Sequence, residues 1–288
     1  MDEYVSLSST KIYLQFSDDN VSDDPTVLRF IRDASRAIRR QTRRDFLPRR
    51  RIYKLDYPDK PNQLRTDLDI LELKGLSDLN GGRSFSVDSV LLSAGCEYHL
   101  QPSNNITIKS NSGSLFNFSG TYQQAIWVDA ITGYREDYDV EGWVNTGASL
   151  TASATSKVLS LSVSGSSGEN GLGHFPRFTP QMLLKVDSEF IYINSITDTS
   201  TLKVVRGARG TTAASHASGV QINMFSVEPE IEFLTKRLAA WSYMQQSNPF
   251  GNTLAAPAFG TIEIPTSWPE DVKERIKKYT VKTVKKAY

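Results

Sequence analysis

Residues 24–45 carry the pattern that most constrains the fold, because they predict a helix with two opposite faces. At about 100° per residue, apolar side chains gather on one side of this helix: Val27, Phe30, Ile31, Ala34, Ala37 and Ile38. Four arginines fall within about 60° of one another on the other side: Arg32, Arg36, Arg39 and Arg43. The apolar side must pack on a core, which leaves guanidinium groups on the outside. We expect the helix to end near Asp45, before Pro48.

Two more helices are predicted near the other end of the chain, over residues 229–246 and 268–287. In the first, Ile231, Leu234, Leu238 and Trp241 recur at spacings of three and four, and Phe233, Ala240 and Met244 widen the apolar surface. In the second, an apolar side is flanked by many lysines. Prolines and glycines in residues 248–264 predict a linker between these two helices.

Between the terminal helices the pattern changes to short β-like runs separated by turn residues. Those before residue 135 are centred on 51–57, 69–73, 87–92, 97–100, 106–109 and 125–128, and later ones on 158–163, 182–186, 190–193 and 202–205. Residues 140–225 are also poor in charge and rich in Ser, Thr, Gly and Ala. We therefore predict an α+β fold with antiparallel β modules inserted between terminal helices. The expected domains are a helical core of residues 1–46 and 226–288, a β-rich domain of residues 47–139 and a small inserted β domain of residues 140–225.

The composition bounds the class of protein. The chain has 288 residues, of which 39% are hydrophobic, so it can bury a substantial core. The single cysteine, Cys96, cannot form an internal disulfide or a multi-thiolate metal site. The acidic start Met1-Asp2-Glu3-Tyr4 is unlike a signal peptide, and the chain has no run of about 18 apolar residues. We expect synthesis in a reducing cytoplasm and no membrane association.

The net charge of +1 conceals a strong segregation of charge along the chain. Residues 1–24 have one basic and six acidic side chains, whereas residues 25–51 have ten arginines against two aspartates, a net +8. Residues 52–269 carry −6 and residues 270–288 carry +4. Arginine is favoured where planar contacts to carboxylate or phosphate persist. The arginine-rich helix is therefore the candidate interface of this chain.

Three interpretations of this helix remain open. Its arginines, with Arg40 and Arg44 added to the four above, face nucleic acid, or an acidic protein surface, or only solvent. The acidic surface is either the amino-terminal segment or the acidic middle of a neighbouring copy. If about five arginines bind phosphates, the logarithm of affinity should fall with the logarithm of salt concentration at a slope near −4.5.

Residues suited to catalysis or metal binding do not form a recognisable set, so we predict no enzyme, no metal and no cofactor. His99, His174 and His216 are isolated in sequence, and we interpret them as surface or loop residues. The segment Arg206-Gly207-Ala208-Arg209-Gly210-Thr211 resembles a phosphate-binding loop but lacks the Gly-Lys-Ser/Thr ending, so a tight β turn is favoured.

A cluster of acids gives a second, weaker candidate for chemistry. Glu136, Asp137, Asp139 and Glu141 offer paired carboxylates for glycoside cleavage, but adjacent acids in a loop are usually solvated. A depolymerase is accordingly the least favoured hypothesis. Cys96 is expected to serve packing.

The segment Asp33-Ala-Ser-Arg-Ala-Ile-Arg-Arg-Gln-Thr-Arg-Arg-Asp-Phe46 resembles the early helix of the head-to-tail connector, or adaptor, proteins of tailed bacteriophages. The runs Leu71-Glu-Leu-Lys-Gly-Leu-Ser-Asp-Leu and Ile264-Pro-Thr-Ser-Trp-Pro-Glu-Asp-Val272 are similar to that family's layout. The segment Asp187-Ser-Glu-Phe-Ile-Tyr-Ile, with Leu202-Lys-Val-Val-Arg-Gly-Ala-Arg-Gly-Thr-Thr-Ala-Ala-Ser-His216, is similar to a small β module that recurs in phage virion proteins.

This resemblance implies a structural virion protein located in the neck, between capsid and tail. Its copies, typically twelve, would form a ring under the portal, help to retain and channel the DNA, and offer the tail or a stopper protein a docking surface. The basic carboxy-terminal residues Lys277, Lys278, Lys282, Lys285, Lys286 and Tyr288 would dock on the portal. Arg32, Arg36, Arg39, Arg40, Arg43 and Arg44 would lie between subunits or towards the packaged DNA. The chain is longer than the compact members of that family and has the 140–225 insertion.

Overall fold

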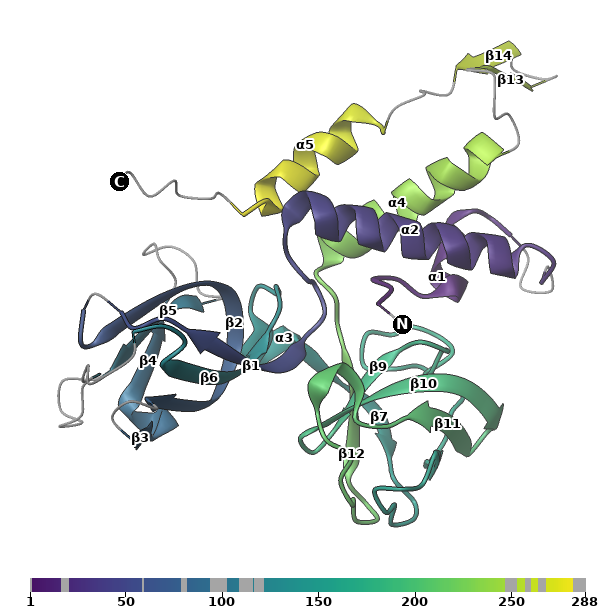
Figure 1. Cartoon of the computed structure of the whole chain (residues 1–288). Coiled ribbons are helices and arrows are strands. Elements are labelled where there is room, and N and C mark those ends of the chain that lie inside the picture. The colour runs from purple at the N-terminus through teal and green to yellow at the C-terminus, as the bar shows by residue number, and fades with distance from the viewer. Residues whose placement is uncertain are drawn as a thin grey trace. The chain divides into compact units, whose positions relative to one another are not determined.

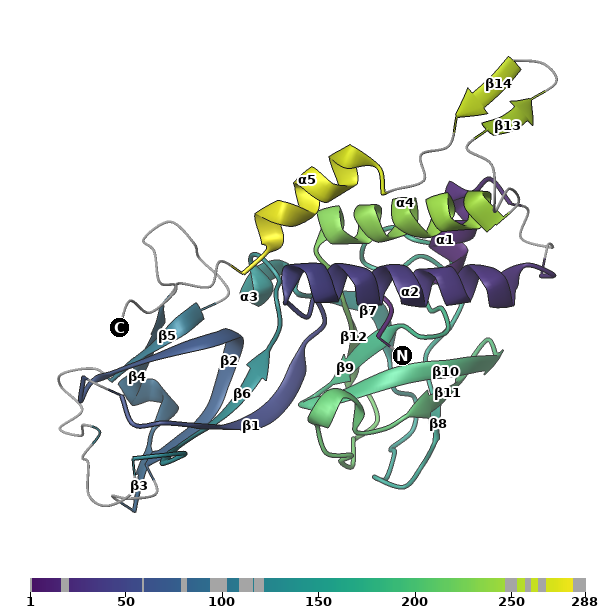
Figure 2. The same cartoon turned by 45° about the horizontal axis from the view of Figure 1, so that its top comes forward.

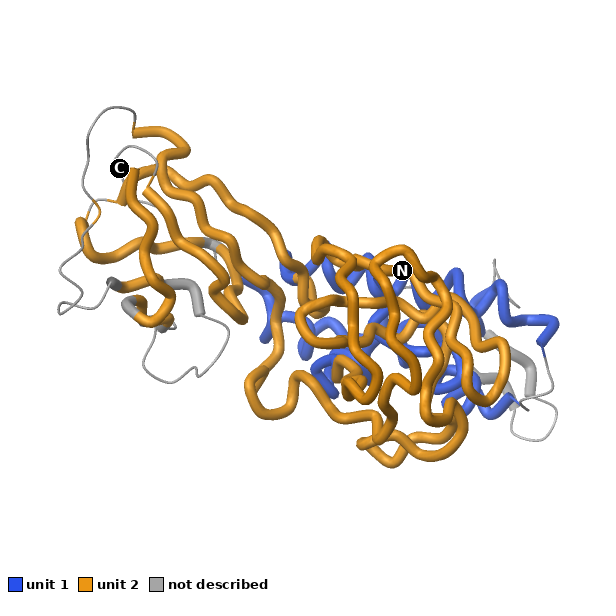
Figure 3. Tube along the Cα trace, turned by 90° about the horizontal axis from the view of Figure 1, so that it is seen from below, with its two compact units in different colours: residues 1–44, 227–288 blue, residues 45–226 orange. Residues whose placement is uncertain are grey.

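The computed structural model describes residues 2–16, 21–58, 60–78, 82–93, 103–108, 116, 122–246, 253–256, 260–263 and 268–281. It has an α+β fold with antiparallel sheets, which confirms the predicted class (Figure 1). The chain divides into two compact units, one of residues 1–44 with 227–288 and the other of residues 45–226 (Figure 3).

The first unit is built from four helices: α1 (Leu7–Tyr13), α2 (Asp24–Thr42), α4 (Pro229–Gln246) and α5 (Glu270–Tyr279). Helices α2, α4 and α5 lie side by side (Figures 1 and 2), and α4 contacts all three of the others. Its buried side chains accordingly extend around much of the helix, from Ile231 and Leu234 to Ala239 and Ala240. Helix α2 likewise contacts α1, α4 and α5, so α2 and α4 together form the centre of the helical unit.

Helix α2 buries the side that the sequence predicts. Val27, Ile31, Ala34 and Ile38 are buried, and the chain leaves the helix at Arg43, whose φ of 59° is left-handed. Helix α5 is shorter than predicted. It ends at Tyr279 because Thr280 is extended and the Val281 N–H donates to the carbonyl of Thr42, outside the helix.

Two further elements of this unit differ from the sequence prediction. Helix α1 is not predicted, since its seven residues are too few for a clear periodicity; Ser6 caps it by accepting a hydrogen bond from the Ser9 N–H. Residues 248–264, expected to be a linker, contain an antiparallel two-stranded ribbon of β13 (Thr253–Ala256) and β14 (Gly260–Glu263).

The second unit contains two six-stranded antiparallel sheets. The strands of the first are β1 (Arg49–Leu55), β2 (Gln63–Asp78), β3 (Arg83–Phe85), β4 (Val90–Ser93), β5 (Ser103–Ile108) and β6 (Ile126–Thr132). Their order is β1-β6-β2-β5-β4, with β3 beside β2. The predicted strand at 87–92 begins instead with a 3₁₀ turn over Val87–Ser89. Ile70, Ile106, Ile126 and Val128 form the centre of this core.

The strands of the second sheet are β7 (Trp143–Ser149), β8 (Ser160–Ser162), β9 (Leu183–Val186), β10 (Glu189–Asp198), β11 (Thr201–Val205) and β12 (Gln221–Phe225). Their order is β7-β12-β9-β10-β11-β8. A bridge between Leu150 and Val163, with backbone bonds on both sides of it, joins β7 to β8 and closes the sheet on itself. A short helix, α3 (Tyr138–Glu141), precedes β7, and a 3₁₀ turn, η3 (Ala208–Gly210), follows β11.

Candidate functional site

The arginines of α2 form one continuous exposed surface, which we call the arginine face: Arg29, Arg32, Arg36, Arg40 and Arg43. These five positions fall within an arc of about 80° around the helix axis, opposite the buried side chains. All five residues are exposed. The sequence prediction of a guanidinium surface on this helix is therefore confirmed, with Arg36 in the middle of the arc and Arg39 and Arg44 at its margins.

Acidic residues of the amino-terminal segment neutralise one margin of the arginine face. The Nε of Arg32 lies 2.7 Å from Oε1 of Glu3, and the Nη1 of Arg39 lies 3.3 Å from Oδ2 of Asp2. The Tyr4 N–H donates to the Ser35 hydroxyl at 3.2 Å, which holds this segment along α2. One of the acidic partners considered from the sequence, the amino-terminal segment, is thus supplied within the same chain.

The charges at the centre of the arginine face are not neutralised by ion pairs in the described part of the chain. Arg36 and Arg40 make no hydrogen bond or ion pair with any residue in the described part of the chain. The guanidinium of Arg29 lies 5.1 Å from the ring centroid of its neighbour Phe30. Because a guanidinium group offers parallel N–H donors, this surface is suited to carboxylates or phosphates.

The predicted carboxy-terminal docking residues are only partly described. Lys277 and Lys278 are exposed on the last turn of α5, where positive charge is favourable next to the helix carboxyl end. Lys282, Lys285, Lys286 and Tyr288 lie outside the described residues. The two described docking candidates, Lys277 and Lys278, thus lie on the folded helix α5.

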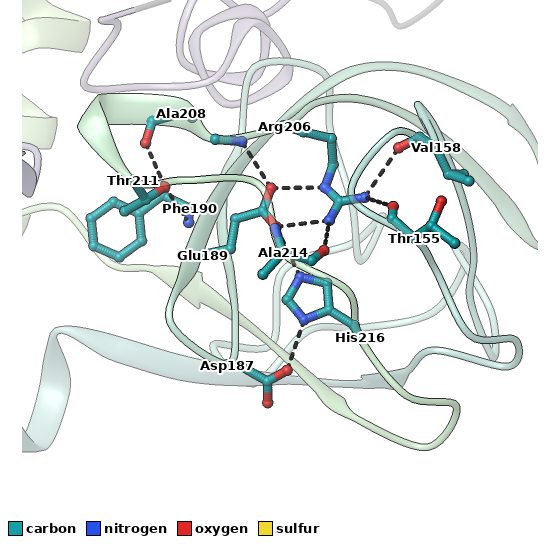
Figure 4. Close-up of polar contacts among 11 residues, drawn as sticks. Thr155, Val158, Asp187, Glu189, Phe190, Arg206, Ala208, Thr211, Ala214 and His216 are labelled. Atoms are coloured by element: carbon teal, nitrogen blue, oxygen red, sulfur yellow. Dashed lines mark hydrogen bonds and ion pairs between the residues drawn. The ribbon is translucent and has the colours of Figure 1, made fainter.

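A buried polar network in the second sheet was not predicted, and Glu189 is its centre (Figure 4). Both carboxylate oxygens of Glu189 lie 2.7 Å from nitrogens of Arg206, and the side chains are 0% and 3% exposed. The carboxylate also accepts backbone N–H bonds from Gly207 and Ala214 at 2.8 and 2.9 Å. His216 adds a further contact, with Nε2 2.9 Å from Glu189 and Nδ1 2.7 Å from Asp187.

These contacts determine the ionisation of Glu189. Burial by itself raises the pKa of the Glu189 carboxyl, but the hydrogen bonds from Arg206, Ala214, Gly207 and His216 outweigh it and lower the pKa to about 2. Glu189 is therefore ionised at neutral pH and holds the loop of residues 206–216 onto β10.

The same loop uses its second arginine internally. Arg209 is 8% exposed and donates from Nη2 to Asp45 at 2.6 Å and to the Leu47 carbonyl at 2.9 Å, and from Nε to the Pro48 carbonyl at 3.1 Å. Both guanidinium groups and two loop amides are thus engaged within the protein. This agrees with the tight turn favoured from the sequence, and both arginines of the loop bind groups of the protein itself.

The remaining sequence candidates do not converge on a reactive centre. His216 is a loop residue, as one of the two predicted alternatives has it, but it is buried at 4% exposure and not on the surface; His174 is exposed. Glu141 pairs with Arg135 at 3.0 Å, and Glu136 accepts the Tyr134 hydroxyl at 2.9 Å. Cys96 and His99 lie outside the described residues. Within the described ranges, no group of three or more His, Cys, Asp or Glu residues is arranged to hold a metal ion.

One signal in the sequence pointed to the network. Glu189 directly precedes the apolar run of β10, and a carboxylate at the start of a buried strand requires a cation. Arg206 supplies it from the end of β11, 17 residues away, and only the pairing of β10 with β11 brings the two together.

Comparison with protein-family models, with curated proteins and with solved structures found no match to this chain. Among the residues that the structure describes, no helix has the length and apolar character needed to span a membrane.

Proposed function

We propose that this chain is a structural virion protein, a head-to-tail adaptor that forms a ring under the portal in the neck of a tailed bacteriophage. The proposal rests on the family resemblance of residues 33–46 and, above all, on the arginine face that this segment carries. A helix with one apolar side on a core and one cationic side, on which Arg36 and Arg40 have no partner in the described part of the chain, is suited to assembly with acidic surfaces. The proposed partners are further copies of the chain, twelve in a ring, the portal and a tail or stopper protein.

Incorporation into particles tests this proposal. We expect Arg36→Glu/Arg40→Glu to be absent from purified particles although the isolated chain keeps its circular dichroism spectrum. Lys60→Glu/Arg65→Glu is a matched control, because it makes the same charge change at two exposed positions outside α2. The control should be incorporated normally. A native chain that is absent from the neck of particles, as seen by mass spectrometry and low-resolution mapping, would overturn the proposal.

The carboxy-terminal residues give an independent test for the portal. Lys277→Glu/Lys278→Glu reverses two exposed cations of α5 and should weaken binding of the purified chain to portal rings. Binding that is unchanged by the reversal and unchanged by salt would contradict the assignment of this end to the portal.

A second candidate function is nucleic-acid binding through the arginine face, favoured by the exposure of Arg36 and Arg40. Each phosphate contact lowers the slope of log affinity against log salt by about 0.9, so about five contacts give a slope near −4.5. A flat salt response of duplex DNA binding by the isolated chain excludes this function.

A further inference from the structure

The centre of the arginine face, Arg36 and Arg40, has no partner in the described part of the chain and is suited to an anionic partner from outside its own helix. Glu3 and Asp2 pair with Arg32 and Arg39, at one margin of the face. Arg36 and Arg40 are four residues apart on α2, so their positions are separated by about 6 Å along the helix. A partner for this centre must present several carboxylates or phosphates over a comparable length.

The chain itself carries a surface with this property, which we call the acidic turn, residues Glu136–Glu141. Four carboxylates in six residues are exposed there: Glu136, Asp137, Asp139 and Glu141. The apolar side chain of Val140, at 82% exposure, stands among them. Three of the four residues of α3 are thus exposed to solvent, and only Tyr138 is buried.

Buried contacts hold the acidic turn in one conformation. The Trp143 indole N–H donates to the buried Tyr138 hydroxyl at 2.8 Å. Arg135, with a side chain that is 4% exposed, donates to the Ser226 carbonyl and to Glu141, both at 3.0 Å. The acidic turn is therefore preorganised, and little conformational entropy is lost when it binds a partner.

Charge favours this occupant over a nucleic acid. The net charge of the chain is only +1, and residues 52–269 carry −6, so a polyanion attracted by α2 is repelled by most of the molecule. A second copy is attracted instead, because its acidic turn presents four exposed carboxylates, one of them paired with Arg135, to a face on which Arg36 and Arg40 have no partner in the described part of the chain. The exposed Val140 would also become desolvated in such a contact.

We infer that the arginine face of one copy binds the acidic turn of a second copy of this chain. The two surfaces are different, so the contact is heterologous and repeats from copy to copy, as a ring requires. This inference rests on the proposed function for its biological setting, but it is tested on the purified chain alone.

The experiment uses two charge-reversed chains. In the first, Arg36→Glu/Arg40→Glu reverses the centre of the arginine face; in the second, Glu136→Lys/Asp139→Lys reverses two carboxylates of the acidic turn and leaves the Glu141–Arg135 pair intact. Sedimentation at high protein and low salt concentration should show self-association of the native chain. Each reversed chain alone should associate at least about tenfold more weakly, because two or more ion pairs become repulsive. A mixture of the two should recover association, since each reversed surface then meets an opposite charge.

The mixing step separates this contact from its alternatives. If association recovers only in a single chain that carries both sets of substitutions, and not in the mixture, the contact lies within one molecule and the inference is overturned. Loss of duplex DNA retention by the first chain, with association unchanged, assigns the face to nucleic acid and also overturns it. A native chain that stays monomeric at all concentrations overturns it too, whereas detection of the chain in particle necks decides the proposed function separately.

A disulfide test does not depend on how well the reversed chains fold. Arg36→Cys and Val140→Cys are placed in separate chains, each with Cys96→Ser so that no other thiol is present. Both substituted positions are exposed, so the fold should tolerate them. Oxidation of the mixture should give the mixed dimer in at least about fivefold excess over oxidation of either chain alone. Equal yields would contradict the contact.

Discussion

Glu189 contacts four groups of one loop, and an amide in its place has only one acceptor oxygen and no charge to balance Arg206. Arg206 is 3% exposed on its side chain and has no solvent to replace the carboxylate. We therefore expect Glu189→Gln to lower the free energy of unfolding by about 3–5 kcal/mol, the cost of breaking a buried ion pair. Asp187→Asn is the matched control, because Asp187 contacts the same histidine but its side chain is 54% exposed. Its cost should stay below about 1 kcal/mol in the same urea titration.

Lowering the pH should reduce the free energy of unfolding by protonating Glu189. The pKa of Glu189 is about 2 in the folded chain against an ordinary value of 4.5, so its contribution is complete above pH 4.5 and is lost as the pH falls towards 2. The loss amounts to roughly 3 kcal/mol over that window. Unfolding free energies measured from pH 6 to pH 2 should show this decrease in the native chain. In Glu189→Gln the decrease should be smaller by that amount, and equal slopes for the two chains would contradict the assignment.

At the scale of the elements, periodicity predicts those parts of the fold that bury one continuous side. Helix α2 is the clearest case, with Val27, Ile31 and Ile38 buried as expected. Strand β7 is not predicted because its inward positions are Thr146 and Ala148. The Thr146 hydroxyl donates to the Ile222 carbonyl of β12 at 2.7 Å, so a polar residue stands where the pattern requires an apolar one.

The arginine face and the Glu189 network also differ in how far the sequence alone predicts them. The arginine face follows from spacing within one helix, and the sequence is sufficient to predict it. The Glu189 network depends on which strands pair, and its residues are spread from Asp187 to His216. Sequence reasoning identified the glycine-rich loop beside this network but could not assign its arginines to Glu189 and Asp45, because these contacts are set by tertiary structure.

Gly210 tests how the η3 turn is joined to β1. A Cβ atom at Gly210 would lie 2.1 Å from the carbonyl oxygen of Arg50, which is backbone and cannot move aside. Gly219 has nearly the same φ, +86° against +87°, but nothing within 4 Å of such an atom. Gly219→Ala should therefore cost only the strain of a left-handed conformation, about 1 kcal/mol. Gly210→Ala should cost at least about 2 kcal/mol more, from overpacking.

Equilibrium unfolding of the two alanine variants measures this difference. Since the backbone strain is shared, the excess for Gly210→Ala reports the close approach of η3 to β1 alone. Equal costs for the two substitutions would mean that the turn does not lie against Arg50.

At the scale of the whole molecule, the chain places two kinds of structure in separate units. Its helical unit is formed by residues from both ends of the sequence, and residues 45–226 form the other unit. The arginine face belongs to the first and the acidic turn to the second. The helical unit carries a net +3 and the other unit a net −2, so the charges of the arginine face and of the acidic turn are local features of opposite sign, which suits contacts between identical subunits.

This division predicts that residues 45–226 fold without the rest of the chain. Their two hydrophobic cores are drawn entirely from within that range, and so are the contacts of Glu189 and Arg209. The isolated fragment should therefore unfold cooperatively, and Glu189→Gln should cost the same free energy in the fragment as in the full chain, within about 0.5 kcal/mol. Circular dichroism and urea titration of the four proteins test this. A soluble fragment without a cooperative transition, or a markedly smaller cost of the substitution in the fragment, would show that the β modules depend on the helices for their stability.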